Sequence, residues 1–250
     1  MSAAAACLAL GGACAATSVA WLYYSRASIA IRVSQTRALI GESWNFAKWL
    51  LAAHIMASAQ RQVAYWLLAA LAGAAATGVF AACMSVVSFA NPIMIGLGNL
   101  LIPKAVLAFK GSGRRGLLRQ TARDSLMLGA AIGLFCVIVL FAGADIMRLL
   151  YHSQEYQGQN ATIALLALAL LPYAIGFPAC NGLATMERPQ AIVWAGLIGL
   201  VITVTFLFLA VTGWGLAGAA FAVFAGSAAE AAMRWISFLA LTSRSERRQA

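Results

Sequence analysis

The sequence has few charged residues, and acidic residues are especially scarce. Only 10% of its 250 residues are charged, with seven Asp and Glu in total, whereas 63% are hydrophobic. The mean hydropathy is +0.86. No water-soluble domain of ordinary composition approaches these values. The composition therefore excludes a soluble protein and indicates a chain solvated mainly by lipid.

Residues and motifs of catalytic, metal and redox chemistry are also scarce. The only histidines are His54 and His152, and no HExxH, GxSxG or DxD-type motif occurs. The five cysteines lie in apolar stretches without CxxC spacing, which is typical of packing residues. A membrane-embedded enzyme would need a cluster of titratable residues facing one leaflet, and the sequence indicates none. We therefore expect no enzyme, no catalytic residue, no metal and no cofactor.

Apolar stretches long enough to cross a membrane recur along the whole chain. A hydrocarbon core of ~30 Å requires roughly 20 helical residues. No charge occurs between Arg61 and Lys104, a stretch too long for one crossing, and the turn-prone residues 73–78 are expected to divide it. We predict an all-α, polytopic membrane helix bundle of about seven transmembrane helices, at residues 2–24, 45–68, 75–109, 119–150, 160–185, 189–212 and 215–242.

Positive charges are concentrated in every second connection between these spans. The net charge of +10 would suggest nucleic-acid binding in a soluble protein, but here its placement indicates membrane topology and lipid contact. The opposite connections carry essentially only Arg148 and Glu155. The positive-inside rule predicts a cytoplasmic C-terminus and an extracytoplasmic N-terminus. The basic connections contain Arg26, Arg32, Arg37, Lys110, Arg114, Arg115, Arg119, Arg123, Arg188, Arg244, Arg247 and Arg248.

Polar side chains form stripes along three of the predicted spans. Such groups are costly inside a bilayer, by about 2.5 to 3.5 kcal/mol for a charged residue at mid-span. Glu230 and Arg234 are spaced to pair on the last span. Pro172 and Pro178 predict an interrupted fifth span. The candidate residues of a substrate cavity are His54, Ser58, Arg61, Asn91, Asn99, Asn181, Glu230 and Arg234.

Two interpretations of these stripes stay open at this stage. In the first, they line a hydrophilic cavity in which Arg61 and Arg234 contact an anionic ligand. In the second, they form ordinary hydrogen bonds between helices, and the two arginines extend toward the membrane interfaces.

The order of short motifs from residue 41 onward resembles a known transporter family. The motifs are GESWNFAKW at 41–49, GVFAA at 78–82, NLLIP at 99–103, IMRLLY at 146–151, NGLA at 181–184 and GWGLAGAA at 213–220. In this order they resemble the second half of polysaccharide and lipid-linked oligosaccharide flippases of the multidrug/oligosaccharidyl-lipid/polysaccharide exporter superfamily.

The resemblance implies two six-helix lobes around a central cavity that works by alternating access. Residues 1–24 would be the last helix of a first lobe, 25–44 a basic cytoplasmic linker, 45–243 the second lobe and 244–250 a cytoplasmic tail. We therefore expect the C-terminal part of a longer transporter, completed by an N-terminal lobe or a second chain. Many family members carry an acidic residue near the position of Gln60 and Arg61.

The implied function is translocation of a polyprenyl-pyrophosphate-linked oligosaccharide or polysaccharide precursor across the cytoplasmic membrane, for O-antigen, lipopolysaccharide or exopolysaccharide assembly. The family's cationic contact to pyrophosphate is carried over to Arg61. Two alternatives stay open, an ion-coupled multidrug exporter of the same superfamily and a non-transporting, truncated or structural membrane subunit.

Overall fold

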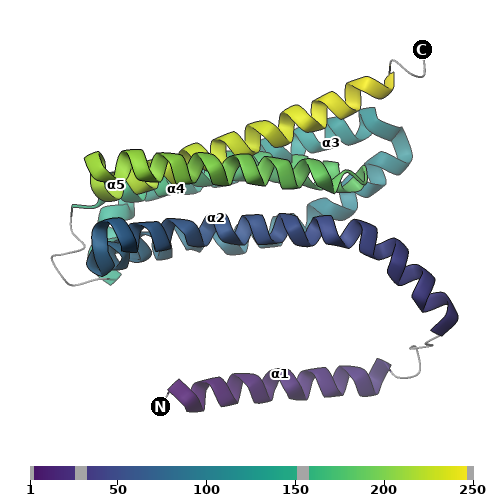
Figure 1. Ribbon diagram of the computed structural model, residues 1–250, viewed down its shortest axis with the longest axis horizontal. Coiled ribbons are helices and arrows are strands. Elements are labelled where there is room, and N and C mark those ends of the chain that lie inside the picture. The colour runs from purple at the N-terminus through teal and green to yellow at the C-terminus, as the bar shows by residue number, and fades with distance from the viewer. Residues whose placement is uncertain (1–2, 26–32, 151–157, 247–250) are drawn as a thin grey trace. The chain divides into compact units, whose positions relative to one another are not determined.

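The described part of the protein consists almost entirely of helices. The computed structural model describes residues 3–25, 33–150 and 158–246, and no β-strand occurs in these ranges. Its two compact units are Met1–Asn45 and Phe46–Ala250. The predicted all-α class is thus confirmed for these ranges. The elements are α1 (Ala3–Ser25), α2 (Val33–Val87), the 3-10 helix η1 (Ser88–Ala90), α3 (Asn91–Leu150), α4 (Asn160–Thr185) and α5 (Pro189–Glu246) (Figure 1).

Several residues named from the sequence lie outside the described ranges. They are Arg26, Arg32, His152, Glu155, Arg247 and Arg248.

Each of the three longest elements contains a break at a glycine in the left-handed region. The φ angle is 84° at Gly73 in α2, 61° at Gly113 in α3 and 55° at Gly215 in α5. Only glycine adopts such angles without a steric penalty. The break predicted for residues 73–78 is therefore confirmed at Gly73.

Contacts across these breaks show that the elements fold back on themselves. In α5, Gly199 packs against Glu230 on the far side of Gly215, and Gly218 lies against the backbone of Ala210. In α2, the rings of Tyr65 and Phe80 meet edge to face, with centroids 5.6 Å apart. The two halves of α5 are therefore antiparallel neighbours, and α2 reverses in the same way.

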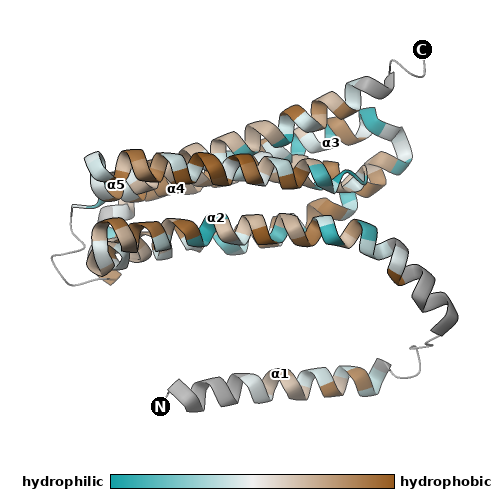
Figure 2. Cartoon of the chain, in the orientation of Figure 1, coloured by the Kyte–Doolittle hydropathy of each residue, from teal (hydrophilic) through white to brown (hydrophobic). Residues whose placement is uncertain are grey.

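Three stretches of the described chain are long and apolar enough to cross a membrane. They are Ser43–Gly143, Asn160–Thr185 and Pro189–Ser243. Large apolar side chains such as Leu107, Leu126 and Phe141 are exposed, as lipid-facing residues would be. Hydrophilic residues gather around the turn of α3 and near the middle of α2 (Figure 2). The chain is a helical membrane protein. The count of seven spans stays a prediction, because the first stretch of 101 residues contains reversals of its own.

The predicted interruption of the fifth span is wrong, because α4 continues through both Pro172 and Pro178. A proline in a helix tilts nearby carbonyls outward, and neighbouring helices in a membrane can satisfy those groups. Three residues before Pro178, the Ile175 carbonyl accepts hydrogen bonds from Ser125 Oγ and Trp235 Nε1, both at 2.9 Å.

Pro172 shows the same arrangement at a second position of α4. Three residues before it, the Ala169 carbonyl accepts a hydrogen bond from Ser227 Oγ at 3.0 Å. Side chains of α3 and α5 thus donate hydrogen bonds to α4 carbonyls close to both prolines. At Asn91 and Pro92, by contrast, the helix is disturbed, since η1 separates α2 from α3 immediately before Asn91.

Candidate functional site

A buried ion pair lies within the second half of α5. Glu230 and Arg234 are one helical turn apart, their exposed fractions are 5% and 7%, and Arg234 Nη2 contacts Glu230 Oε1. The pairing predicted from their spacing is therefore present. A charge inside a membrane helix is tolerated when an opposite charge lies against it. Removing one member would leave the other as an uncompensated buried charge.

Glycines on two other helical segments make room for this pair. A Cβ at Gly199 would lie 2.9 Å from Glu230 Cβ and 3.2 Å from Gln60 Nε2. A Cβ at Gly196 would lie 3.9 Å from Glu230 Oε1, and one at Gly176 would lie 3.7 Å from Arg234 Cδ. The ion pair thus occupies the junction of α4, the two halves of α5, and the part of α2 that carries Gln60.

The charges around Tyr173 of α4 give this junction a positive balance. Tyr173 is within electrostatic range of Arg234, Glu230 and Arg61. Arg61 comes from α2, is exposed, and donates a hydrogen bond from Nη2 to Ser58 Oγ at 3.1 Å. Because the Glu230 carboxylate is matched by Arg234, the Arg61 guanidinium is the excess charge at this site.

Two buried donors near this part of the bundle have no acceptor among the described residues. They are Nε of Arg234 and Nδ2 of Asn181. Buried polar atoms in proteins are nearly always hydrogen-bonded, so donors of this kind are available to a ligand or a water molecule. Both groups can only donate, which suits an acceptor such as a phosphate or a sugar oxygen.

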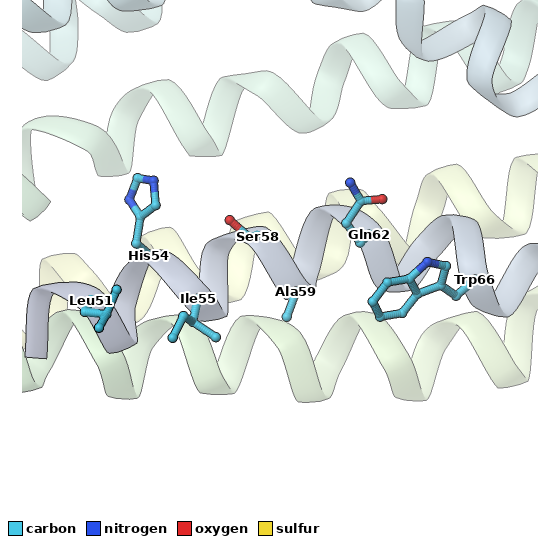
Figure 3. A pocket seen from close by; sticks show the side chains of 7 residues that line it. All are labelled: Leu51, His54, Ile55, Ser58, Ala59, Gln62 and Trp66. Carbon is cyan, nitrogen blue, oxygen red and sulfur yellow. The ribbon is translucent and has the colours of Figure 1, made fainter. Parts of the chain in front are cut away.

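The polar stripe of α2 is a separate feature, and most of it faces away from the core. His54, Ser58 and Gln62 help to line a groove of about 350 Å³ whose walls all come from α2. In Figure 3 these three side chains project from the same side of the helix. The groove lies on the opposite side of α2 from Gln60 and the buried Ala64. The other lining residues are Leu51, Ile55, Ala59 and Trp66.

The structure does not bring all the predicted cavity residues together at one place. Arg61, Glu230 and Arg234 are within electrostatic range of Tyr173, whereas His54 and Ser58 line the groove of α2, and the hydrogen bond from Arg61 to Ser58 links the two sets. Asn91 and Asn99 are exposed on α3, and no contact joins them to either site within the described ranges. Asn181 is half-buried on α4.

Sequence reasoning missed Gln60, Gln62 and Tyr173. The two glutamines carried a usable signal, because an amide in an apolar span is costly unless it has a partner. Tyr173 carried no such signal, since tyrosine is common near membrane interfaces. Within the described part of the chain, no three His, Cys, Asp or Glu side chains lie close enough to hold a metal ion.

Fold and site together define a helical membrane protein with a buried ion pair and an adjacent exposed guanidinium. Comparisons with protein-family models, with curated proteins and with solved structures find no match for this chain.

Proposed function

We propose that this chain is the C-terminal lobe of a flippase that moves a polyprenyl-pyrophosphate-linked saccharide across the cytoplasmic membrane by alternating access. The ordered motifs between residues 41 and 220 support this proposal through their resemblance to such transporters. An N-terminal lobe or a second chain completes the transporter. The function is binding and reorientation of the lipid-linked substrate, without bond formation.

The charge balance at Tyr173 is the observation that carries the proposal. The Glu230 carboxylate is paired with Arg234, and the Arg61 guanidinium, within electrostatic range of the same tyrosine, is hydrogen-bonded only to the neutral Ser58. Arg61 is exposed, so its planar guanidinium can reach an anionic headgroup and bind two phosphate oxygens at once. A pyrophosphate headgroup fits a site of this kind.

The same balance disfavours an exporter of organic cations. Such a substrate calls for a carboxylate without a cationic partner, and the buried carboxylates of the described residues have partners. Glu230 pairs with Arg234, and Asp124 accepts a hydrogen bond from Gln120 Nε2 at 2.9 Å while Lys104 and Arg123 are within electrostatic range.

We further propose seven membrane crossings, with the C-terminus in the cytoplasm and the N-terminus outside. The reversals at Gly73, at Ser112–Gly113 and at Gly215 support this count, because the helical stretches between them exceed ~20 residues once the short end of α2 is counted together with η1 and the first part of α3. The turn at Ser112–Gly113 lies among Lys110, Arg114 and Arg115, which favours the cytoplasmic side for this turn.

Translocation in reconstituted vesicles tests the proposed substrate class. The full transporter is assayed with a fluorescent polyprenyl-pyrophosphate disaccharide and, in parallel, with ethidium as an organic cation. Arg61→Ala removes a charge-assisted hydrogen bond worth about 1.5 to 3 kcal/mol, so we expect a roughly tenfold to hundredfold loss of saccharide translocation. Arg61→Lys keeps the charge without the planar fork and should retain an intermediate rate. Arg119→Ala, an exposed cation elsewhere on α3, is the matched control.

The comparison between the two probes decides the outcome. Ethidium transport in the absence of saccharide transport would contradict the proposal and support the multidrug exporter. An equal loss in Arg61→Ala and Arg119→Ala would mean that the effect reflects overall charge, and Arg61 would then have no specific role.

A further inference from the structure

Tyr173 exposes an aromatic ring and an unpaired hydroxyl group in the middle of a membrane helix. It lies 13 residues after the start of α4 and 12 before its end, which places it roughly 18 Å from either end. Its exposed fraction is 37%, and its hydroxyl makes no hydrogen bond within the described ranges. A hydroxyl in hydrocarbon without a partner is costly. This position therefore calls for a partner with polar groups.

The ring of Tyr173 is supported by Phe177, one helical turn further along α4. The two ring centroids are 6.3 Å apart, and the ring planes are inclined by 44°. Phe177 in turn covers Gly98 of α3, where a Cβ would lie 3.0 Å from Phe177 Cε1. These contacts restrict the side chain of Tyr173, which lowers the entropy cost of packing a ligand against its exposed part.

We propose that Tyr173 binds the saccharide of the transported lipid, with the sugar next to the pyrophosphate packed on the exposed part of its ring. This inference rests on the proposed function and adds to it the residue that contacts the sugar. Tyr173 is within electrostatic range of Arg61, the proposed pyrophosphate contact, and of the Glu230–Arg234 pair. The first sugar is bonded directly to the pyrophosphate, so it lies close to Tyr173 when Arg61 holds the phosphates.

The chemistry of Tyr173 favours the sugar over the polyprenyl chain, which is the other group bonded to the pyrophosphate. A pyranose ring presents C–H groups on its faces, and its hydroxyl groups both donate and accept hydrogen bonds. A phenol offers the matching apolar face and polar end. An isoprenoid chain would leave the Tyr173 hydroxyl without a partner, whereas exposed apolar side chains such as Leu107 and Phe141 offer that chain an environment without polar groups.

Binding of two lipids that differ only in the saccharide tests this role of Tyr173. The full transporter in nanodiscs is titrated with a fluorescent polyprenyl-pyrophosphate disaccharide and with the same polyprenyl pyrophosphate without sugar. Tyr173→Leu removes the ring, so we expect about threefold to tenfold weaker binding of the saccharide lipid and unchanged binding of the sugar-free lipid. Tyr173→Phe keeps the ring and should weaken binding of the saccharide lipid alone by about twofold to threefold. Phe141→Leu, at an exposed aromatic residue of α3, is the matched control.

The pair of lipids separates a failure of this inference from a failure of the proposed function. Arg61→Ala should weaken binding of both lipids, because both carry the pyrophosphate. A transporter that binds neither lipid would contradict the proposed function itself. If both bind, equal weakening of the two by Tyr173→Leu, or no weakening of the saccharide lipid, would overturn the role of Tyr173. Should Tyr173→Leu fail to fold, the nearly isosteric Tyr173→Phe decides, and an unchanged ratio of the two affinities would overturn the proposal.

Discussion

Replacing Glu230 by Met should destabilise the protein strongly, whereas replacing Glu230 and Arg234 together should not. Both side chains are at least nine-tenths buried, and Gly196 and Gly199 pack against Glu230. Loss of one member of a buried pair costs about 3 to 5 kcal/mol, because the remaining charge is left without a counter-ion. Replacement of both by apolar residues of similar size is often neutral or stabilising.

The assay for this prediction is equilibrium unfolding in mixed SDS micelles, followed by tryptophan fluorescence. Glu230→Met alone should lower the free energy of unfolding by about 3 to 5 kcal/mol, and adding Arg234→Met should restore most of that loss. Arg119→Met, at an exposed position, controls for the loss of a positive charge and should change it by less than about 0.5 kcal/mol. Equal stability of the single and double variants would refute the coupling of the two charges.

Two other predictions concern α4 and the topology of the chain. Ser125→Ala and Trp235→Phe should each lower the free energy of unfolding by about 0.6 kcal/mol. The double variant should lose more than the sum of the two, because the Ile175 carbonyl then loses both side-chain donors. The same unfolding assay measures these losses, and additive effects would contradict the prediction. A membrane-impermeant maleimide should label Ser112→Cys only from the cytoplasmic side and Asn160→Cys only from the outside, and labelling of both from one side would contradict the seven-span arrangement.

The helix breaks were predictable wherever a local residue type decides the backbone. Gly73 lies in an uncharged stretch too long for one crossing, and glycine alone adopts a left-handed φ angle easily. The hydrogen bonds that other helices donate to α4 close to Pro172 and Pro178 were not predictable, because they join residues far apart in the sequence. Ser125 lies 50 residues from Ile175 and Trp235 lies 60, and nothing local indicates that they meet.

In the candidate site, too, features set by neighbouring residues were predictable, and features set by contacts between distant segments were not. The Glu230–Arg234 pair follows from a spacing of four residues on one helix, and the structure contains it. The direction in which a polar stripe faces does not follow from spacing, because a membrane helix is apolar on the side toward lipid as well as on the side toward protein. His54 and Ser58 were expected to line a substrate cavity; they line a groove whose walls come from α2, and their role in a substrate cavity stays a prediction.

Hydrogen bonds distinguish the interface between α4 and α5, which they hold in place, from the interface of α2 with these helices. Along α4 and the second half of α5, Ser227 and Trp235 bond to α4 carbonyls, and the ion pair lies between them in sequence. Sliding one helix by a turn would break both hydrogen bonds between α5 and α4, inside lipid, where water cannot replace them. On α2, by contrast, Ser58 bonds only within its own helix. A conformational cycle that moves α2 against α4 and α5 therefore breaks fewer hydrogen bonds than one that separates α4 from α5. Alternating access requires a helix that can move in this way relative to its neighbours.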